Sequence, residues 1–91
     1  MAKQIFYAFT CDVYKSHKSE RLIFIGTSHQ KLKMLLSEKI ERGEIEYYNS
    51  ELPAKKQAEI FRHDFGIKTR NYLNDNLNYA YFDYTYNNEE M

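Results

Sequence analysis

Two apolar segments near the N-terminus, separated by a short polar stretch, restrict the fold more than any other feature of this chain. QIFYAFTCDVY, residues 4–14, alternates between two faces with a period of two residues, as a β-strand does. RLIFIG, residues 21–26, is apolar on both faces, as is expected of a central strand. The polar KSHKSE between them has the length of a hairpin connection. The sequence therefore predicts a β-hairpin at the start of the chain.

Helix caps and apolar spacing predict three helices and two further strands downstream. The first helix carries Leu32, Leu35, Leu36 and Ile40 at helical spacing, and the third is expected to turn Tyr72, Leu73 and Leu77 inward. The expected elements are a helix capped by Thr27 or Ser28 that ends at Gly43, a strand over 44–48, a helix capped by Ser50 with Pro53 in its first turn that ends at Gly66, a short helix capped by Thr69, and a strand over 79–86.

The order β-β-α-(β)-α-α-β predicts a small α+β domain. We expect two layers: an antiparallel sheet of three to four strands, with the helices gathered on one of its faces. Ninety-one residues supply one hydrophobic core, so residues 1–87 form a single domain and residues 88–91 a frayed acidic tail. The chain lacks an apolar run of about 20 residues, so we expect no membrane span.

Helices on one face would leave the other face of the sheet open. We assign the more apolar side of each strand to the helices, which predicts Ile5, Tyr7, Phe9, Cys11 and Val13, then Ile45 and Tyr47, then Ala80, Phe82, Tyr84 and Tyr86 as inward-facing. The outer face would then carry Phe6, Thr10, Asp12, Tyr14, Glu44, Glu46, Tyr48, Tyr79, Tyr81 and Asp83. A register slip of one residue in the last strand would exchange its two sides.

That outer face is aromatic, and all its charges are negative. Tyrosine combines a large rigid ring with a hydroxyl group and is enriched in protein interfaces. We therefore predict a protein-binding surface made of Tyr14, Tyr48, Tyr79, Tyr81, Asp83, Glu44 and Glu46. Two alternatives remain: the tyrosines stabilise the sheet as cross-strand pairs, or the face joins two copies in a homodimer.

Basic residues are concentrated in the first half of the chain. Residues 1–42 carry eight Lys and Arg against four Asp and Glu, whereas residues 43–91 carry five against nine. Lys15, Lys18, Arg21, Lys31 and Lys33 could contact phosphate around the hairpin loop and the first helix. Nucleic-acid binding through this loop is an alternative that we do not favour, because acidic residues on the aromatic face would repel phosphates.

Catalytic and metal-binding signatures are missing from the sequence. Histidines 17, 29 and 63 do not have zinc-ligand spacing, and Cys11 is a single cysteine that fits a reducing bacterial cytoplasm. We expect a protein without enzymatic activity, cofactor or metal.

FIGTS, Phe24 to Ser28, resembles the second motif of GIY-YIG nucleases, in which a strand ends in Tyr-Ile-Gly before a capped helix. The resemblance implies a hairpin followed by a helix and, more remotely, a degenerate nuclease. The chain departs from the motif because Phe24 replaces the tyrosine and HQKLKMLLSEK lacks the family's arginine. Shared hairpin–helix geometry is the interpretation that we adopt.

In size and composition the whole chain resembles short accessory proteins of bacteriophages and mobile elements, including inhibitors of the anti-CRISPR type. No motif supports this likeness, so it transfers no residue roles. It implies a protein that inhibits or redirects a host defence protein by stoichiometric binding in the bacterial cytoplasm. The sequence hypothesis is thus a non-enzymatic binding module that uses its acidic, tyrosine-rich face.

Overall fold

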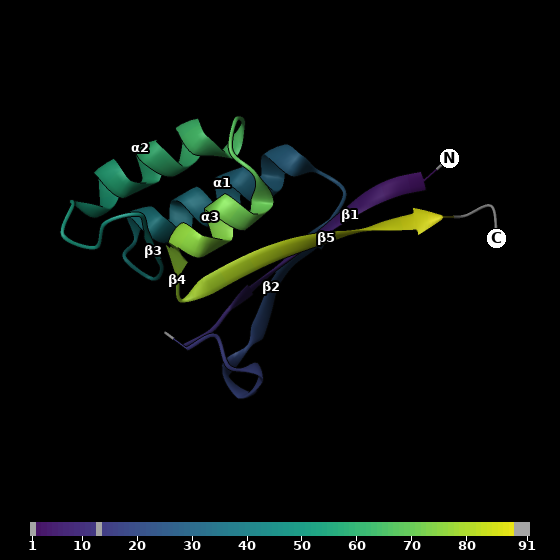
Figure 1. Cartoon of the computed structure of the whole chain (residues 1–91), viewed down its shortest axis with the longest axis horizontal. Coiled ribbons are helices and arrows are strands. Elements are labelled where there is room, and N and C mark those ends of the chain that lie inside the picture. The colour runs from purple at the N-terminus through teal and green to yellow at the C-terminus, as the bar shows by residue number, and fades with distance from the viewer. Residues whose placement is uncertain (1, 13, 89–91) are drawn as a thin grey trace.

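The first and last strands of the chain lie side by side, with the helices packed over one face of the sheet that they form (Figure 1). The computed structural model describes residues 2–12 and 14–88. Its elements are β1 (Ala2–Thr10), the short 3-10 helix η1 (His17–Ser19), β2 (Arg21–Gly26), α1 (His29–Glu41), β3 (Glu46–Tyr47), α2 (Ala54–Phe65), α3 (Arg70–Asn76), β4 (Leu77–Asn78) and β5 (Ala80–Asn88). The predicted α+β class is confirmed, with helices and antiparallel sheets in one globule.

The main sheet has three strands in the order β2-β1-β5, and both pairings are antiparallel. The predicted strand over 44–48 does not join it. Instead β3 is two residues long and pairs with β4 in a separate two-stranded sheet, where Glu46 lies opposite Asn78. The Tyr47 N–H donates to the Gln57 side chain at 2.9 Å, so this backbone is tied to α2 rather than to β1.

Side-chain caps start two of the three helices as predicted. Ser28 Oγ accepts the Lys31 N–H at 3.1 Å, and Thr69 Oγ1 accepts the Tyr72 N–H at 3.1 Å. The predicted cap of the second helix, Ser50, is wrong, because α2 begins at Ala54 with Pro53 as its cap residue. A residue that precedes proline is disfavoured in helical geometry, which keeps the helix from starting earlier.

The third helix is shorter than predicted. It ends at Asn76, so Leu77 is buried as part of β4, and Tyr72 lies at the surface instead of facing inward. Leu73 is buried as expected. The inward placement of Val13 falls outside the described residues, as do the Tyr86 side chain and residues 89–91 of the predicted tail. Asn88, the first residue of that predicted tail (88–91), belongs to β5 instead, and its backbone pairs with β1.

The core lies between the three helices and one face of the sheet. Its buried apolar residues are Phe6 and Ala8 of β1, Ala80 and Phe82 of β5, Leu32, Leu36 and Ile40 of α1, Ala58, Phe61 and Phe65 of α2, Leu73 of α3, and Ile45, Tyr47 and Leu77 from the small sheet and its approach. The predicted inward residues Ile45, Tyr47, Ala80 and Phe82 are therefore correct.

The two faces of β1 are the reverse of the prediction. Phe6 and Ala8 are buried, whereas Ile5, Tyr7 and Phe9 lie on the face without helices. Ala8 and Ala80, both fully buried, provide the reason, because small side chains allow helices to approach the sheet closely. The larger rings of Tyr7 and Phe9 are placed where no helix requires space.

One buried polar pair connects the small sheet to α2. The Tyr47 hydroxyl donates to Asp64 Oδ2 at 2.7 Å, and both residues are buried. Burial and this hydrogen bond raise the pKa of the Tyr47 phenol above its ordinary value. The pair thus depends on the hydroxyl keeping its proton.

Replacing Tyr47 with Phe should lower the free energy of unfolding by about 1–3 kcal/mol, because the Asp64 carboxylate then loses its buried donor. Urea denaturation of Tyr47→Phe would measure the loss. Tyr48→Phe is the matched control, since the neighbouring Tyr48 is exposed and should be neutral. Equal stability of the two variants would contradict the role given to this hydrogen bond.

Asn74 of α3 closes the outer edge of β5. Its amide donates to the Phe82 carbonyl at 2.7 Å and accepts the Phe82 N–H at 3.0 Å, as a neighbouring strand would. The two bonds tie α3 to the sheet and occupy peptide groups that would otherwise be open at this edge.

Asn74→Ala should lower the free energy of unfolding by about 1–3 kcal/mol, because two hydrogen bonds to one residue are lost together. Faster amide hydrogen exchange at Phe82 would accompany the loss. Asn71→Ala, which removes an exposed contact with Arg70, serves as the control and should change stability much less. Unchanged exchange at Phe82 would show that Asn74 does not protect this edge.

Candidate functional site

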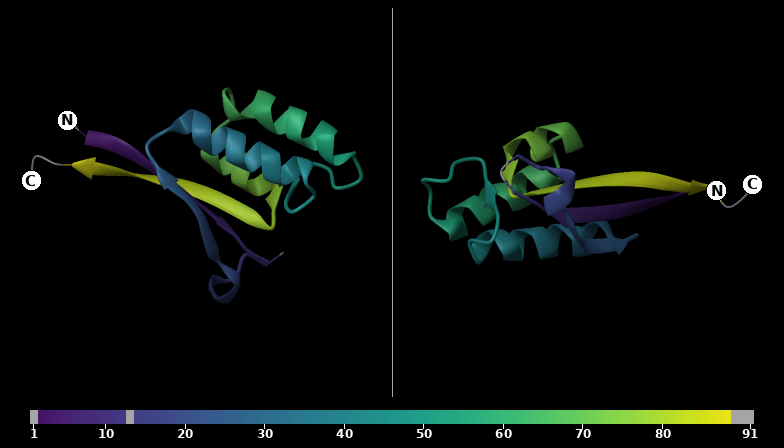
Figure 2. Two further views of the ribbon diagram at one scale, coloured as in Figure 1. Left: turned by 180° about the vertical axis from the view of Figure 1, so that it is seen from behind. Right: turned by 90° about the horizontal axis from the view of Figure 1, so that it is seen from below.

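The face of the main sheet that points away from the helices is a candidate contact surface (Figure 2). Residues directly opposite each other in an antiparallel pair point to the same side. The ladder places Tyr7 opposite both Asp83 and Ile25, and Phe9 opposite both Tyr81 and Leu22. Ile5 and Thr85 form a further pair on the same side. We define the open face as Ile5, Tyr7, Phe9, Leu22, Ile25, Tyr81, Asp83 and Thr85.

Aromatic rings form the centre of the open face. Phe9 stacks on Tyr81 with ring centroids 5.2 Å apart, and Tyr7 meets Phe9 edge-on at 5.8 Å. Beside them, Leu22 is 53% exposed and Ile25 is 67% exposed. Both lie on this face because β2 has a bulge at Ile23. Ala8 of β1 pairs with Phe24, but the next residue, Phe9, pairs with Leu22, so Ile23 has no partner of its own in the register. The result is an apolar patch at the solvent-facing side of β1 and β2.

The acidic groups at this surface already have partners in the fold. Tyr81 donates its hydroxyl hydrogen to Glu20 Oε2 at 2.7 Å, and His17 Nδ1 lies 3.3 Å from the other oxygen of Glu20. Asp83 pairs with Arg70, whose guanidinium also lies 5.3 Å from the ring centroid of Tyr84. The open face is therefore apolar and aromatic at its centre, with paired charges at its margins.

The residues predicted to form the protein interface are not brought together. Tyr81 and Asp83 lie on the open face, while Tyr79 lies at the turn between β4 and β5 with φ of 72°. Glu46 lies in the small sheet, Tyr48 follows it, and Glu44 contacts Lys39 at 3.2 Å in the turn after α1. Tyr14 is exposed in the loop between β1 and η1. The predicted acidic and aromatic surface is thus divided among several parts of the fold.

The five residues proposed for phosphate contact are divided as well. Lys18 and Arg21 lie at the hairpin loop, where the Lys15 ammonium donates to the Asn74 carbonyl at 2.7 Å. Lys31 and Lys33 lie near the start of α1, at the other end of β2. Six strand residues at about 3.3 Å each separate the two groups by about 20 Å, so they do not form one cluster.

Sequence reasoning did not find Tyr7, Phe9, Leu22 and Ile25 as surface residues. The available signal was a pair of alanines, Ala8 and Ala80. Ala8 lies opposite Phe82 and Ala80 lies opposite Thr10, and the two alanines mark where the helices come closest to the sheet. Both sides of β1 are apolar, so the period alone could not distinguish them.

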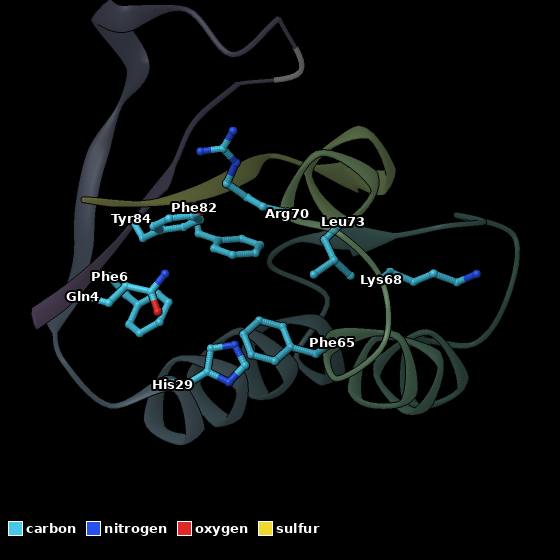
Figure 3. A pocket seen from close by; sticks show the side chains of 9 residues that line it. All are labelled: Gln4, Phe6, His29, Phe65, Lys68, Arg70, Leu73, Phe82 and Tyr84. Carbon is cyan, nitrogen blue, oxygen red and sulfur yellow. The ribbon is translucent and has the colours of Figure 1, made fainter. Parts of the chain in front are cut away.

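A ring-lined hollow lies on the helical side of the sheet, where α1, the end of α2 and the start of α3 meet β1 and β5 (Figure 3). Its volume is about 150 Å³, and its rings come from Phe6, His29, Phe65, Phe82 and Tyr84. His29 packs against Phe65 at 4.4 Å and Phe6 at 5.2 Å between ring centroids. Lys68 and Arg70 contribute to the lining, but Figure 3 shows their charged ends turned away from the hollow.

The environments of His29 and Cys11 shift their protonation equilibria. Burial, with a smaller effect of the Lys33 charge, lowers the pKa of His29 below its ordinary value, which favours a neutral ring in the hollow. Burial raises the pKa of the Cys11 thiol, which disfavours the reactive thiolate. Within the described part of the chain, no group of three or more His, Cys, Asp or Glu side chains could hold a metal ion.

Comparisons with family models, curated proteins and solved structures found no match for this chain. None of the helices in residues 2–12 and 14–88 has the length and apolar character needed to cross a membrane.

Tyr81 provides a pH test of the open-face geometry. Partial burial is the larger cause, and the hydrogen bond to Glu20 the second, of a rise in the pKa of Tyr81 from 10.0 to about 12. The folded protein therefore holds this proton more tightly than the unfolded chain, so the stabilisation is complete below pH 10 and is lost as the pH rises toward 12.

An ultraviolet titration of tyrosinate absorbance, compared with that of Tyr81→Phe, should give a difference curve with a midpoint near pH 12. Glu20→Gln should lower that midpoint toward 10.0 without abolishing the shift, because burial remains. A wild-type midpoint at pH 10 would show that Tyr81 is neither buried nor bonded as described.

Proposed function

We propose that this chain is a non-enzymatic protein-binding module, and that its contact surface is the open face of the main sheet. The observation that supports the proposal is the exposed pair Leu22 and Ile25 beside the stacked rings of Phe9 and Tyr81. Exposed large apolar side chains beside packed rings on a helix-free surface are typical of protein interfaces.

The partner would be another protein rather than a small molecule. The centre of the open face is built from rings and aliphatic side chains on neighbouring strands, and its acidic groups Glu20 and Asp83 are held by Tyr81 and Arg70. The contribution to binding would therefore come mainly from apolar burial, with Glu20 and Asp83 at the rim for orientation. We propose that the chain is a bacteriophage or mobile-element protein. As a small binding module, it would inhibit or redirect a bacterial host protein in the cytoplasm.

Ile25→Glu should weaken capture of the partner by about 30-fold or more, because a charge replaces an apolar anchor. The partner would be sought by affinity capture from nuclease-treated bacterial lysate and mass spectrometry, and its affinity measured with purified components.

Ile67→Glu is the matched control: Ile67 is 65% exposed, nearly as much as Ile25, but lies between α2 and α3. A stoichiometric partner that binds wild type and Ile67→Glu equally, and Ile25→Glu poorly, would support the open face. A partner that binds all three equally would refute that site. Capture only when nucleic acid is left in the lysate would favour the nucleic-acid alternative.

A further inference from the structure

The aromatic rings around the hollow on the helical side of the sheet form a continuous chain. Tyr84 meets Phe6 with ring centroids 6.2 Å apart, and Phe6 meets His29 at 5.2 Å. His29 continues to Phe65 at 4.4 Å, and Phe65 continues to Phe82 at 5.7 Å. Phe82 and Tyr84 are alternate residues of β5 and point to the same side of the sheet, so the chain of rings closes around the hollow.

The volume of the hollow restricts its occupant to a molecule of one ring. The hollow measures about 150 Å³, and an apolar cavity of about this size binds one benzene molecule. Aromatic rings pack favourably against the faces and edges of other rings, so this wall favours an aromatic occupant over an aliphatic one. The hollow can be entered from solvent beside His29, which is exposed at the start of α1.

The charges around the hollow favour an uncharged ligand. Among the nine described residues that line it, Lys68 and Arg70 are cationic and none is Asp or Glu. Aromatic cages can bind cations, but a cation here would be repelled by these two residues. An anion also lacks an anchor, because Arg70 is paired with Asp83 and Figure 3 shows the charged end of Lys68 turned away from the hollow.

Gln4 supplies hydrogen-bonding groups that the fold does not use. Its side-chain amide makes no hydrogen bond to another described residue, and Figure 3 shows that amide directed toward the rings. An amide offers both donors and an acceptor, so it can bond to a hydroxyl group in either sense. The neighbouring His29 adds no charge, because its partial burial keeps its pKa below the ordinary value.

We propose that the hollow is a binding site for an uncharged monocyclic aromatic compound of the phenol class. Its ring would lie among Phe6, Phe65 and Phe82, with His29 as the wall at the entrance. Its hydroxyl group would exchange a hydrogen bond with the Gln4 amide.

This inference goes beyond the proposed function and does not depend on it. Gln4 and Phe6 lie on the helical side of β1, whereas Ile5 and Tyr7 of the open face lie on the other side. A partner on the open face and a ligand in the hollow would thus occupy opposite sides of the sheet. Ile25→Glu should weaken partner capture and leave ligand affinity unchanged, so failure of either proposal is seen separately.

The first test is a titration of the isotope-labelled protein with phenol, followed by two-dimensional NMR of the backbone amides. Phenol should cause saturable shifts at His29, Phe65 and Phe82, with a dissociation constant of about 1 mM or below. Cyclohexanol, benzylammonium and benzoate should each bind about fivefold more weakly or worse, because each lacks the aromatic ring or carries a charge.

Absence of saturable shifts at these amides up to about 10 mM phenol, roughly ten times the expected dissociation constant, would overturn the proposal. Equal binding of cyclohexanol would refute the aromatic preference, and equal or tighter binding of benzylammonium or benzoate would refute the preference for an uncharged ligand.

The ring wall is tested by His29→Ala, which should weaken phenol binding about fivefold or more because one wall of the hollow is lost. Gln30→Ala is the matched control, since Gln30 is the next residue of α1, is also exposed and does not line the hollow. Thermal denaturation would verify that both variants fold. Equal phenol affinity of the two variants would refute the site.

The polar contact is tested by Gln4→Leu, which nearly preserves the side-chain volume but removes the amide. Phenol binding should weaken about threefold or more, whereas benzene binding should not weaken, because only phenol uses the hydrogen bond. An equal loss for both ligands would show that Gln4 only shapes the hollow and would refute the hydrogen bond assigned to it.

Discussion

The pairing of β1 with β5 is the constraint on which the rest of the structure depends. It joins residues 2–10 to residues 80–88 over nine residue pairs, so the two ends of the chain must meet before the sheet can form. Everything between β2 and β5 is then placed on one side of that ribbon, as Figure 1 shows. Most contacts of the sheet join distant parts of the sequence. The chain therefore loses the conformational entropy of closing long loops before the contacts of the core can form.

The placement of all three helices on one face has a direct consequence for the surface. Phe6, Ala8, Ala80 and Phe82 are buried beneath the helices, so the alternate residues of the same strands face away from them. The open face is therefore a product of the two-layer architecture and not of any local signal. Its rings stabilise the sheet by packing on each other, and the same rings are available to a partner.

The tyrosines serve several different purposes, which explains their number. Tyr47 belongs to the core and donates to Asp64, Tyr81 links β5 to Glu20 at the hairpin, and Tyr84 packs beneath Arg70. Tyr14, Tyr48 and Tyr79 are exposed, and two of these adopt positive φ angles at turns. A dense run of tyrosine in the sequence thus corresponds to separate structural roles, with only part of it at the open face.

Much of the fold could be predicted from the sequence because it depends on local physics. The two-residue period of residues 4–10 and the caps at Ser28 and Thr69 act within a few residues of themselves, and they placed the hairpin and two helix starts correctly. The candidate site was harder to predict, because Glu46 lies in β3, and Glu44 and Tyr48 lie on either side of it. The partner strand of β3 is β4, which has only two residues and no recognisable pattern.

By itself the sequence determined that β1 is a strand, that a hairpin begins the chain, and that three helices combine with antiparallel strands in an α+β domain. Only the tertiary structure decided which side of β1 is buried, because that depends on the space beneath the helices and on the small volume of Ala8 and Ala80. It also decided that Leu22 and Ile25 share a face, since the bulge at Ile23 arises from the register between two strands and not from either strand alone.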